Sequence, residues 1–148
     1  MTEPQGEYEP SAWDWVSDQV ATYERTDGAE GSTLQGTDYP IIVVTMKGAR
    51  TGKVRKIGLM RVEHEGQYAL VASKGGMPHN PGWYNNLTTH PDDVSIQDGA
   101  ERFRVDVREV DGDERQTWWD RSVAAYPDYE TYKNNTDRVI PVVILDPA

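Results

Sequence analysis

The residues best suited to chemistry gather in one short stretch, residues 47–61, which has the sequence KGARTGKVRKIGLMR. This basic window carries +6 and no acidic residue, whereas the other 133 residues together carry −16. One guanidinium group can donate hydrogen bonds to two oxygens of a phosphate. Glycines allow backbone N–H groups to approach the same phosphate and donate further hydrogen bonds. The window therefore predicts a phosphate site formed by Arg50, Lys53 and Arg55 with the N–H groups of its glycines. A solvated hairpin tip is the alternative.

The basic window does not match the known nucleotide-binding loops. Gly48 and Gly52 enclose three residues instead of the four of a P-loop, and Val54 stands where Ser or Thr would ligate magnesium. The chain has no GxGxxG motif for a dinucleotide. A nucleic acid would extend from the window onto the acidic remainder of the protein, which repels it. We therefore expect a small phosphorylated ligand and no nucleic acid.

A second candidate is the glycine-containing loop at residues 72–76, ASKGG, which follows an apolar strand. Its glycines let a ligand approach the backbone, and Ser73 and Lys74 offer donors there. An ordinary strand-to-helix connection is the alternative. In the helix that follows, we expect Trp83 to pack in the core, and Asn86 to address a ligand or to cap the helix.

Three tyrosines, Tyr126, Tyr129 and Tyr132, are spaced by three residues. At that spacing they line one side of a helical turn. Three buried phenols each need a hydrogen-bond partner, which makes them a costly choice for a purely apolar core. They suit a pocket wall that stacks on a flat substrate and donates a proton. A half-exposed helix face is the alternative.

Several classes of chemistry are excluded. The chain has no cysteine, so it has no disulfide, thiol nucleophile or iron–sulfur cluster. His64, His79 and His90 are scattered and lack metal-ligand spacing, so we expect no metal. No GxSxG motif is present. Difficult chemistry would therefore have to come from a bound cofactor.

The apolar pattern predicts the elements that must position these residues. Strands are predicted at residues 39–45, 54–63, 67–73, 94–97, 100–110 and 139–145, and helices from an N-cap at Ser11 and at residues 82–89, 113–125 and 128–135. The second and third strands should form one hairpin, and the fourth and fifth another. Too few helices separate the strands for a parallel sheet. We expect a mainly β, α+β fold: a small, predominantly antiparallel barrel with flanking helices.

Length and termini predict a single domain. The 148 residues suffice for one core, which we place at residues 11–148 behind a disordered lead-in at residues 1–10. That lead-in is polar and acidic, unlike a signal peptide, and no apolar run reaches the roughly 20 residues of a membrane span. We expect a cytoplasmic protein.

Six segments, taken in order, resemble one known family: GARTGKVRKIGLMRV, YALVASKGG, HNPGWYNNL, the tryptophan pair at 118–119, YPDYETY and TDRVIPVVIL. The family is that of the actinobacterial deazaflavin (coenzyme F420)-dependent nitroreductases and quinone reductases. The resemblance covers residues 13–145 in collinear order. It implies the split β-barrel fold shared with FMN-binding oxidases.

The resemblance also implies the roles of individual residues. The cofactor phosphate would lie at Arg50, Lys53 and Arg55, and its ring system along Gly58, Leu59, Met60, Val71, Ala72, Ser73, Lys74, Gly75, Trp83 and Asn86. The substrate would be bordered by Trp15, Tyr126, Tyr129 and Tyr132. The family usually has proline at the position of Gly58, so this chain departs from the family's pattern at that ring contact and keeps it at the phosphate site.

The implied reaction transfers a hydride from C5 of the reduced deazaflavin to a small electron-poor acceptor. Quinones, α,β-unsaturated lactones of the coumarin type and nitroaromatics are candidates. Tyr132, Tyr126 or Ser73 would stabilise or protonate the product anion. The alternatives are an FMN-dependent oxidoreductase on the same fold and a non-catalytic carrier of deazaflavin or of a flat hydrophobe. Peripheral membrane contact through Trp13, Trp15 and Val16 is opposed by the acidic residues around them, and the oligomeric state is left open.

Overall fold

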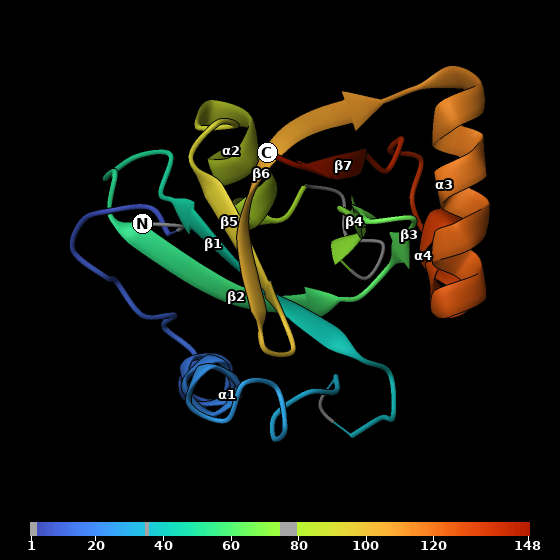
Figure 1. The fold of residues 1–148 in the computed structure, drawn as a ribbon. Coiled ribbons are helices and arrows are strands. Elements are labelled where there is room, and N and C mark those ends of the chain that lie inside the picture. The colour runs from blue at the N-terminus through green and yellow to red at the C-terminus, as the bar shows by residue number, and fades with distance from the viewer. Residues whose placement is uncertain (1–2, 35, 75–79) are drawn as a thin grey trace.

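The computed structural model describes residues 3–34, 36–74 and 80–148, and it confirms the predicted antiparallel α+β split barrel (Figure 1). Seven strands form one antiparallel sheet that curls into a half-barrel, in the order β2-β1-β5-β6-β7-β4-β3. The strands are β1 (Ile41–Lys47), β2 (Val54–Met60), β3 (Glu63–His64), β4 (Gln67–Val71), β5 (Val94–Asp98), β6 (Glu101–Val110) and β7 (Val142–Pro147). The helices are α1 (Asp14–Arg25), α2 (Gly82–Thr89), α3 (Gly112–Ala125) and α4 (Asp128–Asn134).

The predicted strand at residues 54–63 is two strands, which corrects the expected first hairpin. β2 ends at Met60 and pairs with β1, whereas β3 begins at Glu63 and pairs with β4. The two strands lie at opposite ends of the strand order although only two residues separate them. The sheet must therefore curl until its two ends approach each other, as in a split barrel. At the break, Arg61 Nε donates to both carboxylate oxygens of Asp98 at 3.0 Å.

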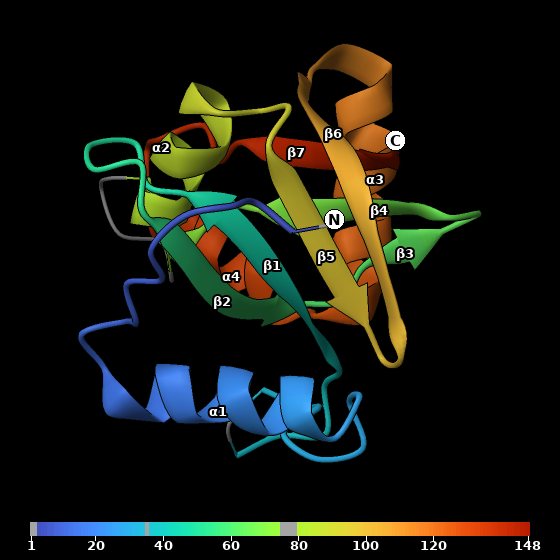
Figure 2. The same ribbon diagram turned by 60° about the vertical axis from the view of Figure 1, so that its left-hand side comes forward.

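The core lies on both faces of this sheet. On β1, Ile42, Val44 and Met46 enter one apolar cluster, whereas Ile41 and Val43 pack on α1. Side chains alternate between the faces of a strand, so a strand covered on both faces is apolar throughout. That is why the YPIIVVT segment shows no polar alternation. The helices α3 and α4 cover a further cluster at β4 and β7 (Figures 1 and 2).

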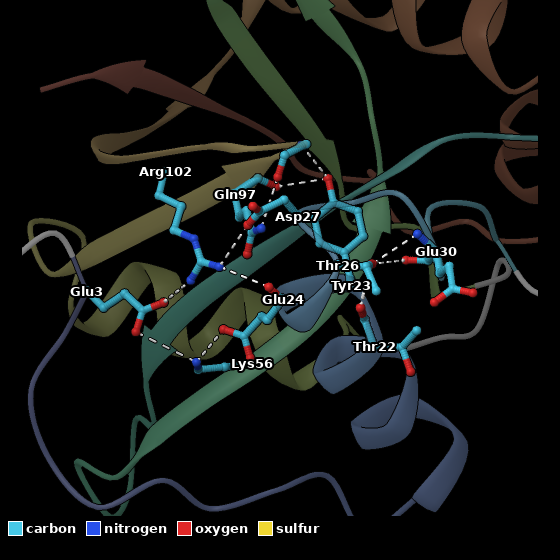
Figure 3. Close-up of polar contacts among 11 residues, drawn as sticks. Glu3, Thr22, Tyr23, Glu24, Thr26, Asp27, Glu30, Lys56, Gln97 and Arg102 are labelled. Atoms are coloured by element: carbon cyan, nitrogen blue, oxygen red, sulfur yellow. Dashed lines mark hydrogen bonds and ion pairs between the residues drawn. The ribbon is translucent and has the colours of Figure 1, made fainter.

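Helix α1 is held on the sheet at its C-terminal end (Figure 3). The Tyr23 hydroxyl accepts the Gly99 N–H at 2.7 Å and lies 3.4 Å from the Gln97 carbonyl. The Glu24 carboxylate accepts from Lys56 Nζ at 2.6 Å. These contacts join α1 to β2 and to the hairpin of β5 and β6. The hairpin itself was predicted from the sequence, and the pairing of β5 with β6 confirms it. The helix begins at Asp14 with Trp13 as its N-cap, and not at Ser11 as expected.

The lead-in, which we expected to be disordered, lies against the sheet in this structure. Residues 3–10, the N-terminal strap, pass along the free edge of β2, where Tyr8 forms a parallel bridge with Val54. The Glu9 N–H donates to the Val54 carbonyl at 2.9 Å, and the Val54 N–H donates to the Glu7 carbonyl at 2.8 Å. The physical reason is local charge: the carboxylates of the strap face the cations of the basic window.

Candidate functional site

A cavity of about 230 Å³ lies between the end of β2, the end of β4 and helix α4. It brings together ten of the residues predicted for cofactor or substrate: Gly58, Leu59, Met60, Val71, Ser73, Lys74, Trp83, Tyr126, Tyr129 and Tyr132. Sequence reasoning missed three further lining residues, Leu34, Leu70 and Pro81, because apolar side chains and an isolated proline carry no chemical signal.

One wall of the cavity consists of the three predicted tyrosines. Tyr126 ends α3, and Tyr129 and Tyr132 lie on α4. The hydroxyl oxygens of Tyr126 and Tyr132 are hydrogen-bonded at 2.9 Å, and the rings of Tyr126 and Tyr129 meet edge to face at 5.0 Å. Burial raises the pKa of Tyr126, and its hydrogen bond with Tyr132 adds to the rise; burial also raises the pKa of Tyr129. These two phenols therefore stay protonated at neutral pH.

The corner at Ser73 and Lys74 bounds the cavity from β4. Ser73 is buried, and its hydroxyl makes no hydrogen bond with any residue that the structure describes. Lys74 has a φ of 47°, a left-handed conformation rare outside glycine. Ala72 is fully buried and does not line the cavity. The predicted Gly75 and the histidine at 79 fall outside the described residues.

The floor of the cavity comes from β2. Gly58 pairs with Val43, and a Cβ at Gly58 would lie 2.7 Å from Ile41 Cδ1. A larger residue would therefore require the Ile41 side chain to move.

Helix α2 joins the cavity to the basic window. Trp83 also lines a second, neighbouring depression, together with Val16, Arg55 and Asn86. A third depression lies at the turn of residues 48–51, and Arg55 and Asn86 line it as well. Adjacent depressions share lining residues, and we call the three together, from the tyrosines to the turn, the trough. Asn86 Oδ1 accepts the Ala49 N–H at 2.9 Å, so this side chain fixes the turn to α2.

The turn differs from the predicted phosphate site in two respects. The N–H groups of Gly48 and Gly52 are used within the turn, since they donate to the carbonyls of Lys53 and Gly48 at 2.8 and 2.9 Å. Two of the three predicted cations are paired with the N-terminal strap: Arg55 with Glu9 at 3.0 Å and Lys53 with Glu7 at 3.7 Å.

Arg50 and the strap define what a ligand would meet at the turn. Arg50 is exposed and makes no ion pair with the residues that the structure describes. Glu9, together with Arg50 and Arg55, lines the depression at the turn. Half-exposed ion pairs of this kind contribute about 0–1 kcal/mol each to stability. A phosphate that accepts two hydrogen bonds from the Arg55 guanidinium can therefore displace the Glu9 carboxylate.

Trp15 does not join the tyrosines. It lies 46 % exposed on α1, in a separate depression with Asp18, Gln19, Thr22 and Gly31. Its predicted role beside the substrate therefore has no support in this arrangement. Within residues 3–34, 36–74 and 80–148, no helix is long and apolar enough to cross a membrane, and no cluster of His, Asp and Glu could hold a metal ion.

Sequence reasoning also missed Arg138, which contacts the corner at Ser73 and Lys74 from the chain between α4 and β7. Its guanidinium donates to the carbonyls of Ala72 and Ser73 at 3.0 and 2.8 Å. Arg138 lies in the TDRVIP segment, and its partners Ala72 and Ser73 precede it by 66 and 65 residues. No local pattern could have indicated this contact.

Comparison with known proteins supplies the family. The family model for the F420H2-dependent quinone reductases matches residues 15–147. An F420H2-dependent quinone reductase of Mycobacterium tuberculosis is 37 % identical over 128 residues, which cover 84 % of this chain and 85 % of that protein. A second protein of that organism, named as a putative F420H2-dependent quinone reductase, is 35 % identical over 108 residues, covering 73 % of this chain and 90 % of its own.

The solved structures agree. The structure of an F420H2-dependent reductase (FDR-A) is 47 % identical with a TM-score of 0.68, and the match covers 76 % of this chain and 99 % of that one. A structure described as a domain-swapped dimer is 44 % identical with a TM-score of 0.71, covering 92 % of this chain and all of that one. The expected oxidoreductase class and the expected cofactor, reduced coenzyme F420, are thereby confirmed. The chain belongs to the F420H2-dependent quinone reductase family.

Proposed function

We propose that the trough binds reduced F420 with its phosphate at the basic turn and its ring system in the cavity. Hydride transfer would then reduce a quinone lying against Tyr126, Tyr129 and Tyr132. The observation that carries this proposal is the succession of adjoining depressions in the trough, which has cations at one end and phenols at the other.

The residues present fit such a cofactor. Arg50 and Arg55 offer guanidinium donors beside a turn that α2 holds in place. Trp83 lies between the turn and the cavity and provides an aromatic surface for a flat ring. The Ser73 hydroxyl lines the cavity with no partner among the described residues, so it can hydrogen-bond a ring edge or the acceptor.

When bound, reduced F420 supplies the hydride. The chain's own residues handle the charge that then develops on the substrate oxygen. Tyr132 Oη donates a proton to that oxygen, and Tyr126 Oη, hydrogen-bonded to Tyr132 at 2.9 Å, stabilises the resulting phenolate. The edge-to-face contacts between the tyrosine rings keep their hydroxyl groups in fixed positions. A proton donor that is already oriented toward the substrate oxygen lowers the entropic part of the barrier.

Unsaturated lactones and nitroaromatics are further acceptors within this proposal. Both are flat and electron-poor, and a wall of phenols suits their shape and the oxygen atoms at their edges. The cytoplasmic location stays a prediction from the sequence.

Three reduced cofactors distinguish this proposal from its alternatives. The purified protein is mixed separately with reduced F420, reduced FMN and NADPH, and oxidation of each is followed with a quinone and with an unsaturated lactone. We expect turnover with reduced F420 and quinone. A yellow protein that oxidises only reduced FMN would overturn the cofactor assignment. Tight F420 binding without turnover of any acceptor would indicate a carrier.

A further inference from the structure

The side chain of Arg138 reaches from the chain after α4 to the corner at the end of β4. Its Nη1 donates to the Ala72 carbonyl at 3.0 Å and to Asn80 Oδ1 at 2.5 Å, and its Nη2 donates to the Ser73 carbonyl at 2.8 Å. Arg138 follows the end of α4, the helix that carries Tyr129 and Tyr132, by four residues. The half-buried guanidinium therefore joins the corner at the end of β4 to the chain segment that supports the tyrosines.

Two successive carbonyls bonded to one guanidinium define the direction of the chain at this corner. The planar fork of arginine presents several N–H groups at fixed angles, whereas a lysine ammonium acts as a single point charge. The next residue, Lys74, has a left-handed φ of 47°, a conformation that costs about 1 kcal/mol or more in a residue other than glycine. Such a conformation persists only where surrounding contacts determine it, and the Arg138 bonds hold the carbonyls of the two residues that precede Lys74.

We propose that Arg138 is a positioning residue for hydride transfer. It does not line the cavity and acts through the corner, where Ser73 and Lys74 do line it. The inference rests on the proposed function, since it assumes that the ring and its acceptor lie in this cavity. A displacement of about 1 Å at such a corner can lower a rate by up to about 100-fold.

The test compares Arg138→Ala and Arg138→Lys with wild type. Arg121→Ala is the matched control: it also removes one positive charge, but Arg121 stacks on Trp118 at 4.6 Å, and neither residue lines the cavity. For each protein the measurements are kcat and KM with reduced F420 and menadione, and the rate of trypsin cleavage after Lys74 in the absence of cofactor. Turnover by Arg138→Ala is also measured with and without methylguanidinium.

We expect kcat of Arg138→Ala to fall about 10-fold or more with a smaller change in the menadione KM, and cleavage after Lys74 to accelerate. Methylguanidinium should restore part of the kcat of this variant and leave wild type unchanged. Arg138→Lys should resemble Arg138→Ala, and it carries the test if the alanine variant does not fold. Arg121→Ala should stay within twofold of wild type.

Two failures are distinguishable. An active wild type, with an Arg138→Ala variant whose kcat and Lys74 cleavage both stay within twofold, would overturn the role of Arg138 alone. A wild-type protein that does not oxidise reduced F420 would overturn the proposed function and this inference with it.

Discussion

The two ends of the trough use different physics. At the turn, Arg50 and Arg55 lie at the surface, and the strap supplies Glu9 as a partner for Arg55. At the other end, Tyr126 and Tyr129 are buried with their rings in contact, and the Tyr126 hydroxyl is hydrogen-bonded to the uncharged Tyr132 hydroxyl. Exposed charges act at long range and are screened by salt, whereas buried phenols act only at contact. We infer that the turn end determines cofactor affinity and that the tyrosine end determines rate.

Tyr132→Phe is the strongest test of this division. We expect kcat to fall about 100-fold, the lower range for loss of a general acid, with the F420 dissociation constant within threefold of wild type. Stopped-flow oxidation of reduced F420 by menadione and a fluorescence titration measure the two quantities. Equal turnover would remove Tyr132 from the mechanism.

Arg55→Ala should have the opposite signature. We expect the F420 dissociation constant to rise about 10-fold, as for loss of a charge-assisted hydrogen bond to phosphate, with kcat at saturating cofactor within threefold. The control is Arg104→Ala on β6, which removes the same charge away from the trough. Unchanged affinity in Arg55→Ala would contradict the placement of the phosphate.

The part of the pH dependence of stability that is lost when a cavity tyrosine is replaced reports on the tyrosine end. The pKa values of Tyr126 and Tyr129 lie above their ordinary value of 10 in the folded protein. Above pH 10 the unfolded chain therefore releases protons that the folded protein keeps. We expect the contribution of these tyrosines to the free energy of unfolding to be constant below pH 10. Above pH 10 it should fall, by up to about 1.4 kcal/mol per pH unit for each tyrosine.

Urea denaturation between pH 8 and pH 11 measures this slope (the range brackets the ordinary tyrosine pKa). The variant Tyr129→Phe serves as the comparison, because it removes one of the six tyrosines whose pKa is raised in the folded protein, the others being Tyr8, Tyr23, Tyr68, Tyr84 and Tyr126. A slope identical to wild type in Tyr129→Phe would show that this phenol ionises equally in both states, contrary to its burial.

The smallest expected effect is at the strap. Glu9→Gln removes the carboxylate that pairs with Arg55, so we expect F420 to bind about threefold more tightly, in line with the small contribution of an exposed ion pair. Glu101→Gln, an exposed site on the β5–β6 hairpin, makes the same charge change elsewhere. If both variants tighten binding equally, net charge and not the strap is responsible.

The same division explains what the sequence could predict. The spacing of Tyr126, Tyr129 and Tyr132 and the charge of the basic window are local patterns, and the structure brings the tyrosines together and puts Arg50 and Arg55 in one depression. The antiparallel hairpin at β5 and β6 followed from its Asp98-Gly99 turn. These features depend on residues that are neighbours in the sequence.

The rest depended on distant partners. The break after Met60 lies where Arg61 meets Asp98, the strap where Glu7 and Glu9 meet β2, and the corner at Ser73 where Arg138 meets it. Trp15 fell on the outer side of α1 because the face of that helix that packs on β1 carries Val20 and Tyr23. A one-dimensional pattern contains no information on such pairings.

The structure of the protein with oxidised F420 bound tests the central claim most directly. We predict a phosphate oxygen within about 3 Å of an Arg55 guanidinium nitrogen, with Glu9 displaced from that side chain and the ring system against Gly58, Leu59 and the Ser73 corner. A phosphate bound elsewhere, with Arg55 still paired to Glu9 and the cavity beside Tyr132 unfilled, would contradict the account.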